Sequence, residues 1–275
     1  MARKDNLPME PLALDDSNAQ LFYVHKGLSA EIVLNRPERL NAMTAGMWRR
    51  LHDIIRLLAD DPQLRCILVR STSPKAFSPG CDILEFDTLR ANSSQGRTYG
   101  RMMHDTLDAF LACPIPILAE IRGICVGAGL EIASVCDLRL CGHTARFGAP
   151  IKNLGLVMAY PELSPLLDIL PEDILLEMLL TGRTYNAEEA LACQMVTRVV
   201  QDDVLERTVQ ETMDAIISGA PLAARWHKRF IRHLSSHQPL SEAEKAICFD
   251  CYDTEDYQEG CQAFKAHRKP VFKGK

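Results

Sequence analysis

The sequence of 275 residues has no long apolar run and no excess of basic residues. No apolar stretch approaches the ~20 residues that a membrane-spanning helix needs, so we expect no membrane association. Residues 1–20 carry charges and prolines without an apolar core, so they do not read as a secretory signal, and we expect them to be disordered. A formal net charge of −5 argues against a general nucleic-acid-binding protein.

Cysteine is abundant, with ten residues, but metal-binding pairs are lacking. The motif C-x-x-C occurs once, at Cys248 and Cys251, without a second pair or zinc-like histidine spacing, so we predict a helix face and no metal site. Because the chain shows no secretory signal, its cysteines are expected to be free thiols in a reducing compartment, the cytoplasm. Five cysteines lie in or beside apolar runs, where a free thiol behaves as a small hydrophobe: Cys66, Cys113, Cys125, Cys136 and Cys141.

Strand-like and helix-like segments alternate through most of the chain, which is typical of an α/β protein. Short apolar strands are predicted at 21–24, 30–34, 66–69, 115–121, 137–141 and 145–147. Helical spacing begins after Thr44 and recurs at 101–111 and 130–135. We therefore expect an α/β core over 21–200.

The pattern becomes mainly helical after Pro161, and we assign 201–275 to a helical C-terminal region. Its helices are predicted at 204–218, at 222–234 and from Ser241 onward. A basic cluster on the second of these covers too much of the helix for a nucleic-acid site. We interpret it as a solvated or subunit-facing surface; its members are Arg225, His227, Lys228, Arg229 and Arg232.

Two glycine-bearing segments, 76–82 and 123–131, carry the clearest chemical signal. Each reads as a strand that enters a glycine turn and then a helix, a geometry that leaves backbone N–H groups free to face an anion. Two such donors aimed at one point can hold the oxygen of an enolate or a tetrahedral intermediate. Glu131 follows Ala128 by three residues, so one helical turn places its carboxylate beside that point.

With these segments, the chain resembles the crotonase superfamily, the enoyl-CoA hydratase/isomerase fold, from about Leu21 to Phe272. The resemblance implies a ββα spiral core that binds an acyl-CoA thioester. It also implies that 201–275 serves oligomerisation, as a homotrimer or a dimer of trimers. Five motifs in family order carry it: 35–42 (NRPERLNA), 76–82 (AFSPGCD), 123–131 (GICVGAGLE), 180–183 (LTGR) and 264–272 (FKAHRKPVF).

The resemblance implies an oxyanion hole formed by the backbone N–H groups of Cys81 and Ala128. Pro79 has no N–H group, but the donor that the family requires here is that of Cys81. A thioester carbonyl held by two donors becomes an enolate more readily at its α-carbon. Glu131 aligns with one of the two glutamates that hydratases of this family use, and we predict it to be the acid/base.

Ile151 occupies the place of the second hydratase glutamate, within the segment 147–151. Isoleucine cannot transfer protons, and hydration requires a water to be oriented and a proton to be delivered. The chain is therefore not expected to be a standard two-glutamate hydratase; isomerisation, lyase chemistry and hydration by an altered arrangement stay open. The alternatives are an acyl-CoA hydrolase or decarboxylase of the same fold, and a non-catalytic acyl-CoA-binding protein.

Four other side chains near these motifs are further candidates for a role in the site. Glu162, after Tyr160-Pro161, is either a replacement for the lost carboxylate or a glutamate at a helix start. His104 either reaches the acyl pocket or is structural. Asp82 is expected to cap a helix, and the Cys81 thiol is expected to be inert because no partner histidine is evident.

Basic residues near the first motifs are candidates for binding the CoA moiety of the substrate. In the family, residues at or near Arg39, Lys75 and Ala76 meet this moiety. Lys265 and Lys269 either do the same from a neighbouring subunit or belong to a solvated basic tail. CoA is part of the substrate in this interpretation, so no separate cofactor and no metal are expected. Residues 84–110 with Val157, Met158 and Tyr160 are expected to line an apolar acyl pocket.

Overall fold

The computed structural model describes residues 13–236 and 238–275. The N-terminal segment predicted to be disordered therefore lies largely outside the described residues. Residues 13–20 run beside the first strands, because Tyr23 N donates to Leu14 O at 3.2 Å and the Asn35 side chain donates to Ser17 O and Ala19 O.

The strands form two sheets. The larger has the order β1 (Leu21–Lys26), β2 (Ser29–Leu34), β3 (Cys66–Ser71), β5 (Ile117–Ile121), β7 (Leu138–Gly142), β10 (Arg198–Val200). The smaller has the order β4 (Ala76–Ser78), β6 (Ile124–Val126), β8 (Arg146–Gly148), β9 (Thr184–Asn186). Neighbours run parallel except β1 with β2 and β8 with β9.

Consecutive strand pairs alternate between the two sheets, which confirms the predicted ββα spiral. The pairs β3–β4, β5–β6 and β7–β8 each place one strand in the large sheet and one in the small sheet. Helices follow each pair: α2 (Phe86–Leu89) and α3 (Ser93–Ala112), then α4 (Ala128–Ser134), then the 3-10 helix η3 (Pro150–Leu154) with α5 (Tyr160–Leu167). Because β4, β6 and β8 are parallel neighbours, the turns that end them lie at one edge of the small sheet.

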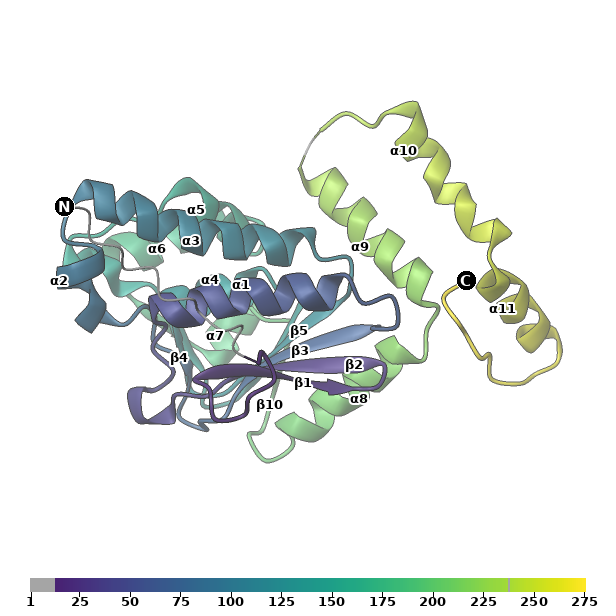
Figure 1. Ribbon diagram of the computed structural model, residues 1–275, viewed down its shortest axis with the longest axis horizontal. Coiled ribbons are helices and arrows are strands. Elements are labelled where there is room, and N and C mark those ends of the chain that lie inside the picture. The colour runs from purple at the N-terminus through teal and green to yellow at the C-terminus, as the bar shows by residue number, and fades with distance from the viewer. Residues whose placement is uncertain (1–12, 237) are drawn as a thin grey trace, which may run out of the picture.

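Helices cover both faces of the large sheet (Figure 1). α1 (Ala45–Ala59) and α3 lie together over one face, and the Thr44 hydroxyl caps α1 by accepting from Met47 N at 3.2 Å. α8 (Leu205–Ile217) covers the other face, where Val209 and Met213 pack with Leu68 and Leu118. α6 (Glu172–Thr181) and α7 (Ala187–Ala192) complete the core region.

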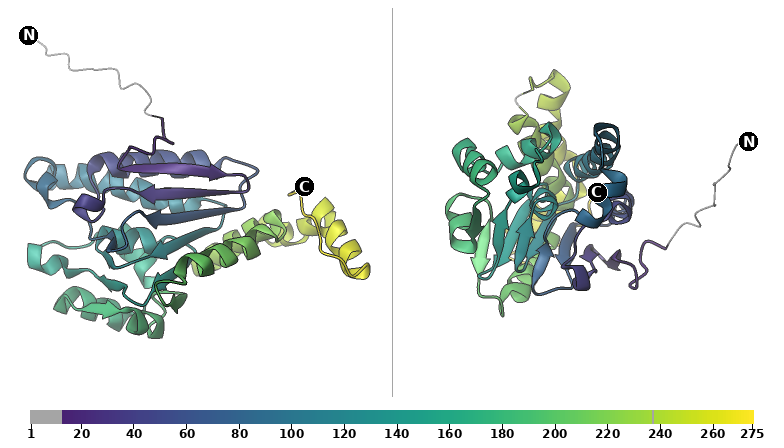
Figure 2. Two further views of the ribbon diagram at one scale, coloured as in Figure 1. Left: turned by 90° about the horizontal axis from the view of Figure 1, so that it is seen from below. Right: turned by 90° about the vertical axis from the view of Figure 1, so that its left-hand side faces the viewer.

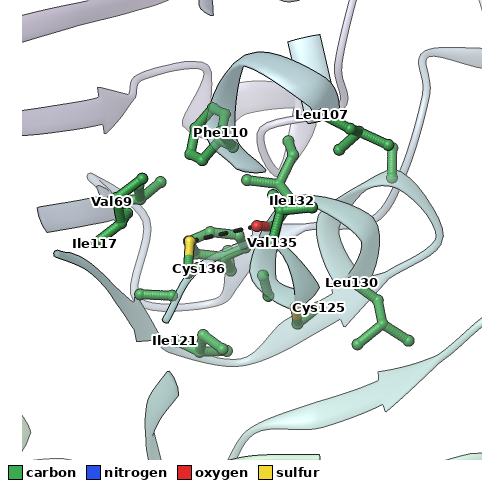
Figure 3. Close-up of a cluster of buried hydrophobic side chains, with 14 of the residues drawn as sticks. Val69, Leu107, Phe110, Ile117, Ile121, Cys125, Leu130, Ile132, Val135 and Cys136 are labelled. Carbon is green, nitrogen blue, oxygen red and sulfur yellow. Dashed lines mark hydrogen bonds between the residues drawn. The ribbon is translucent and has the colours of Figure 1, made fainter. Parts of the chain in front are cut away.

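Helix α4 lies inside the main hydrophobic core. All seven of its residues are buried, and Figure 3 shows Leu130 and Ile132 among side chains from β3, β5 and α3, including Leu107 and Phe110. A short helix surrounded by close-packed side chains cannot shift without opening cavities, each of which costs stability. The core therefore fixes the position of the α4 N-terminus.

The last helices form an arm that extends from the core (Figures 1 and 2). It comprises α9 (Pro221–Ser235), α10 (Glu242–Ala246), η4 (Ile247–Asp253) and α11 (Glu255–Lys265). The C-x-x-C pair lies on η4, so the predicted helix face is confirmed. Phe264 is 83% exposed on the arm, and the oligomerisation role of 201–275 stays a prediction. In the described part of the chain, no helix combines the length and the apolar character needed to cross a membrane.

The basic cluster of α9 joins the arm to the core of the same chain. Lys228 Nζ lies 2.7 Å from Asp137 Oδ2 and donates to Ile115 O, and Arg232 pairs with Asp137 Oδ1 at 2.8 Å. Arg225 donates to Leu64 O at 3.0 Å. The prediction of a solvated or subunit-facing surface is therefore wrong for these three residues, because their partners come from distant strand ends.

Candidate active site

The two glycine turns predicted from the sequence meet in the structure. Gly80 and Gly127 have φ angles of 117° and 53°, in the region that favours glycine. A Cβ on Gly80 would lie 3.5 Å from Val126 O and 3.7 Å from Ala128 N. An added Cβ would thus make only ordinary van der Waals contacts with the other turn, so the positive φ angles, rather than a lack of space, favour glycine at these two positions.

A third glycine sets how closely helix α4 approaches β4. A Cβ on Gly129 would lie 2.4 Å from Ser78 O, closer than real Cβ atoms come. Gly127 N also donates to Gly148 O at 2.9 Å, which ties the second turn to the third spiral pair. The three turns are therefore held as one backbone unit.

In the first turn, the residues on either side of Cys81 form backbone hydrogen bonds, whereas the N–H group of Cys81 does not within the described chain. Met43 N donates to Gly80 O and Asp82 N donates to Met43 O, both at 2.8 Å. The Asp82 carboxylate accepts from Leu84 N at 3.0 Å, as the predicted cap, and pairs with Arg36 at 2.6 Å. Among the described residues, the Cys81 N–H group has no acceptor.

Ala128 is the first residue of α4, so its N–H group has no partner within the helix. It opens with Cys81 onto one cavity of about 130 Å³. Apolar side chains and three ionisable ones line the rest of that cavity. They include Ile83, Phe86, Arg90, Met103, Glu131, Ile151, Val157, Met158 and Glu162.

Glu131 lies in this cavity as predicted, and its carboxyl group is almost without polar contacts. The residue is 5% exposed, and its Oε2 atom has no hydrogen-bond partner among the described residues. Burial, with the nearby Glu162 as a second cause, raises the pKa of Glu131 to about 8, and Arg90 opposes the rise. At neutral pH the carboxyl group is therefore mainly protonated.

Glu162 fits both interpretations that the sequence left open. It lies in the first turn of α5, where its Oε2 atom accepts from Ala159 N at 2.8 Å. It also lines the cavity with Glu131, and its Oε1 atom lies 2.9 Å from Nε2 of His104. The pairing with His104, 58 residues away in sequence, is a contact that the motif analysis did not predict.

Ile151 lies on η3 and reaches the cavity from the third turn. The place expected for a second glutamate thus presents an apolar wall, and the second carboxylate comes from α5. Cys81 also borders the cavity, with Sγ 3.9 Å from Sδ of Met103. Burial raises the pKa of the Cys81 thiol to about 12, so this thiol stays neutral and is a poor nucleophile.

The residues predicted to bind the CoA moiety fall into two groups. Arg39 is exposed at the end of η1 (Pro37–Arg39), and Lys75 is exposed just before β4, where Ala76 is buried. Lys265 ends α11 in the C-terminal arm, which extends from the core, and Lys269 lies in the tail that follows it. The role of these two lysines from a neighbouring subunit and the other three assignments stay predictions.

Arg90 is the cavity residue that sequence reasoning missed. It follows α2, and its guanidinium carbon lies 4.5 Å from the ring centroid of Phe86 and 5.0 Å from that of Tyr99. It falls in the segment 84–110, which was expected to supply an apolar lining. No motif surrounds it, so only the fold reveals that it faces Glu131 and Glu162.

Comparison with known proteins agrees with this geometry. The sequence profile of the family described as enoyl-CoA hydratase/isomerase matches residues 26–275. The chain belongs to this family. It is an acyl-CoA-processing enzyme of the enoyl-CoA hydratase/isomerase type, as the resemblance implied.

Individual members of the family align along almost the whole chain. The short-chain-enoyl-CoA hydratase of Clostridium acetobutylicum is 28% identical over 89% of this chain and 94% of its own length. The carnitinyl-CoA dehydratase of Escherichia coli K12 is 32% identical over 93% and 98%. A crystal structure of an enoyl-CoA hydratase/carnithine racemase from Magnetospirillum magneticum has a TM-score of 0.92 and 45% identity, covering 94% of this chain and 96% of that one.

Proposed function

We propose that this enzyme adds water to, or removes water from, the α,β double bond of an acyl-CoA, using Glu131 together with Glu162, which replaces the second hydratase glutamate. The observation that carries the proposal is the cavity itself. It holds two carboxyl groups with different surroundings beside two backbone N–H groups that lack acceptors among the described residues. Two acids in different environments are the usual basis for dividing acid and base roles.

The chemistry follows from which group carries a proton. The thioester oxygen accepts hydrogen bonds from Cys81 N and Ala128 N, which stabilise the enolate that forms when oxygen bonds to the β-carbon. Glu162, held by His104 and Ala159, takes a proton from the attacking water. Protonated Glu131 donates its proton to the α-carbon. One water is added across the double bond, and the proton on Glu162 later replaces the one that Glu131 lost.

The names of the relatives support a reaction of this type, since one is called a hydratase and another a dehydratase. The CoA moiety is proposed to meet Arg39 and Lys75 near the first turn, with Ala76 beside them. Lys265 and Lys269 are proposed to reach the same site from the arm of a second chain in a homotrimer or a dimer of trimers. No cofactor besides the substrate's own CoA is included in the proposal.

A panel of acyl-CoAs followed by mass spectrometry tests the reaction type. The expected result is gain of one water by an α,β-enoyl-CoA, with no release of free CoA. A shifted double bond without mass change would replace hydration by isomerisation. Free CoA or lost CO₂ would indicate a hydrolase or a decarboxylase, and binding without turnover would indicate an acyl-CoA-binding protein.

Glu162→Gln tests the pairing of the two carboxyl groups through a pH profile. Removing the negative neighbour lowers the pKa of Glu131 from about 8, because Glu162 is one cause of the rise. The high-pH limb of the residual kcat/KM, which requires protonated Glu131, is expected to move to lower pH. His104→Gln is the matched control, since it removes the partner but keeps the Glu162 charge. An unmoved limb in Glu162→Gln contradicts the pairing.

A further inference from the structure

Among the described residues, Arg90 is a cavity cation without an ion-pair partner. Within 13–236 and 238–275, no hydrogen bond or ion pair joins its guanidinium group to another residue. Other partly buried arginines in this chain do have partners: Arg36 pairs with Asp82, and Arg232 pairs with Asp137. A cation at a cavity wall with free donors is expected to bind an anion that enters the cavity.

The carboxyl groups beside Arg90 do not use its donors. Glu131 has an Oε2 atom without a partner in the described chain and forms no ion pair with Arg90. Glu162 is engaged by His104 and by Ala159 N. The N–H groups of Arg90 are thus available to a ligand.

Two aromatic rings hold the guanidinium group in place. The ring centroids of Phe86, at the start of α2, and Tyr99, on α3, both lie within 5.0 Å of its central carbon. When a guanidinium group stacks against ring faces, the N–H groups at the edge of its plane remain free. This edge can bind a carboxylate through two parallel hydrogen bonds. The arrangement is therefore prepared before a ligand arrives.

We propose that Arg90 binds a carboxylate at the far end of the acyl group, so that the substrate is the CoA thioester of a short dicarboxylic acid. This inference rests on the proposed function, because it places the far end of an enoyl group in the cavity beside Glu131. The cavity of about 130 Å³ favours a short acyl group. An acyl group ending in a trimethylammonium is disfavoured, because the rings of Phe86 and Tyr99 already hold a cation.

The test uses three but-2-enoyl-CoA thioesters that differ only in the group on carbon 4: a carboxylate, a methyl or a trimethylammonium. Hydration of each is followed by mass spectrometry, and kcat/KM is measured. The carboxylate thioester is expected to exceed the methyl thioester by about 10- to 100-fold, the usual range for a hydrogen bond to a charged group. The trimethylammonium thioester is expected to be the poorest of the three.

Arg90→Met is expected to bring the carboxylate-to-methyl ratio close to one, and Arg90→Lys to leave a smaller preference, because lysine keeps the charge without the planar fork. Arg97→Met, on α3 outside the cavity lining, is the control that keeps the native ratio. A ratio is measured within one protein sample, so a partly unfolded variant does not distort it.

Two outcomes overturn the assignment of Arg90: a native ratio near one, or a native ratio that persists in Arg90→Met. With either outcome, hydration of the methyl thioester would still support the proposed function. If none of the three thioesters gains water, the proposed function itself fails.

Discussion

Glu131→Gln is expected to slow acyl-CoA turnover by about two to four orders of magnitude, the range for loss of a general acid or base. Gln is nearly isosteric with a protonated glutamic acid, so the cavity keeps its shape, and the proposed contact of the thioester with the N–H groups of Cys81 and Ala128 is retained. We therefore expect the loss in kcat, with little change in acyl-CoA affinity by calorimetry. Glu172→Gln, exposed at the start of α6, is the matched control.

The same variant has a stability signature that separates a buried acid from an ordinary surface glutamate. The pKa of Glu131 lies at about 8 in the folded protein, against an ordinary value of 4.5. The folded state therefore binds more protons than the unfolded state between these values, and this carboxyl group lowers stability as pH rises through that range. The Tm of Glu131→Gln relative to native protein should rise from about pH 5 to about pH 8. Equal kcat in variant and native protein, or a flat Tm difference, contradicts the assignment.

Gly129→Ala is expected to lower kcat by at least two orders of magnitude, although it changes no ionisable group. The added methyl would lie 2.4 Å from Ser78 O, so α4 and β4 must separate. Separation moves the Ala128 N–H group away from that of Cys81, and loss of one such donor costs roughly 10²- to 10³-fold in kcat. Overpacking should also lower the free energy of unfolding by about 1–3 kcal/mol.

Gly96→Ala is the matched control for this substitution. Gly96 lies on α3, and no neighbouring atom lies within 4 Å of the place that an added methyl group would take. Alanine also favours the helix by up to about 1 kcal/mol relative to glycine. Both variants are compared by urea unfolding and by kcat/KM. Native-like kcat/KM in Gly129→Ala would show that the approach of α4 to β4 does not set the oxyanion geometry.

Short-range sequence signals located several helices, and a physical reason explains where the prediction of a helix boundary was wrong. Asn186 and Glu189 have the spacing of a capping box, and they form reciprocal hydrogen bonds of 2.9 Å at the start of α7. The helix predicted over 101–111 begins earlier, at Ser93, because the Asn92 side chain caps it through Ser94 N and Gln95 N. Its first turns are polar, so they lack the apolar periodicity on which the prediction relied.

The sequence by itself determined the two glycine turns, the family and the absence of a glutamate at position 151. Each of these depends on residue type and on short spacing: only glycine readily takes the φ angles at 80 and 127, and isoleucine cannot carry a proton. Such properties are local, so they are visible without the fold.

Only the tertiary structure decided which groups share the cavity. Glu162 meets His104 across 58 residues, and Arg90, just after α2, lines the same cavity as the two carboxyl groups. The spiral brings these segments together by stacking parallel strands, and burial there raises the pKa of Glu131. Electrostatic coupling depends on the distance between groups and on their dielectric surroundings, and neither can be read from short-range sequence patterns.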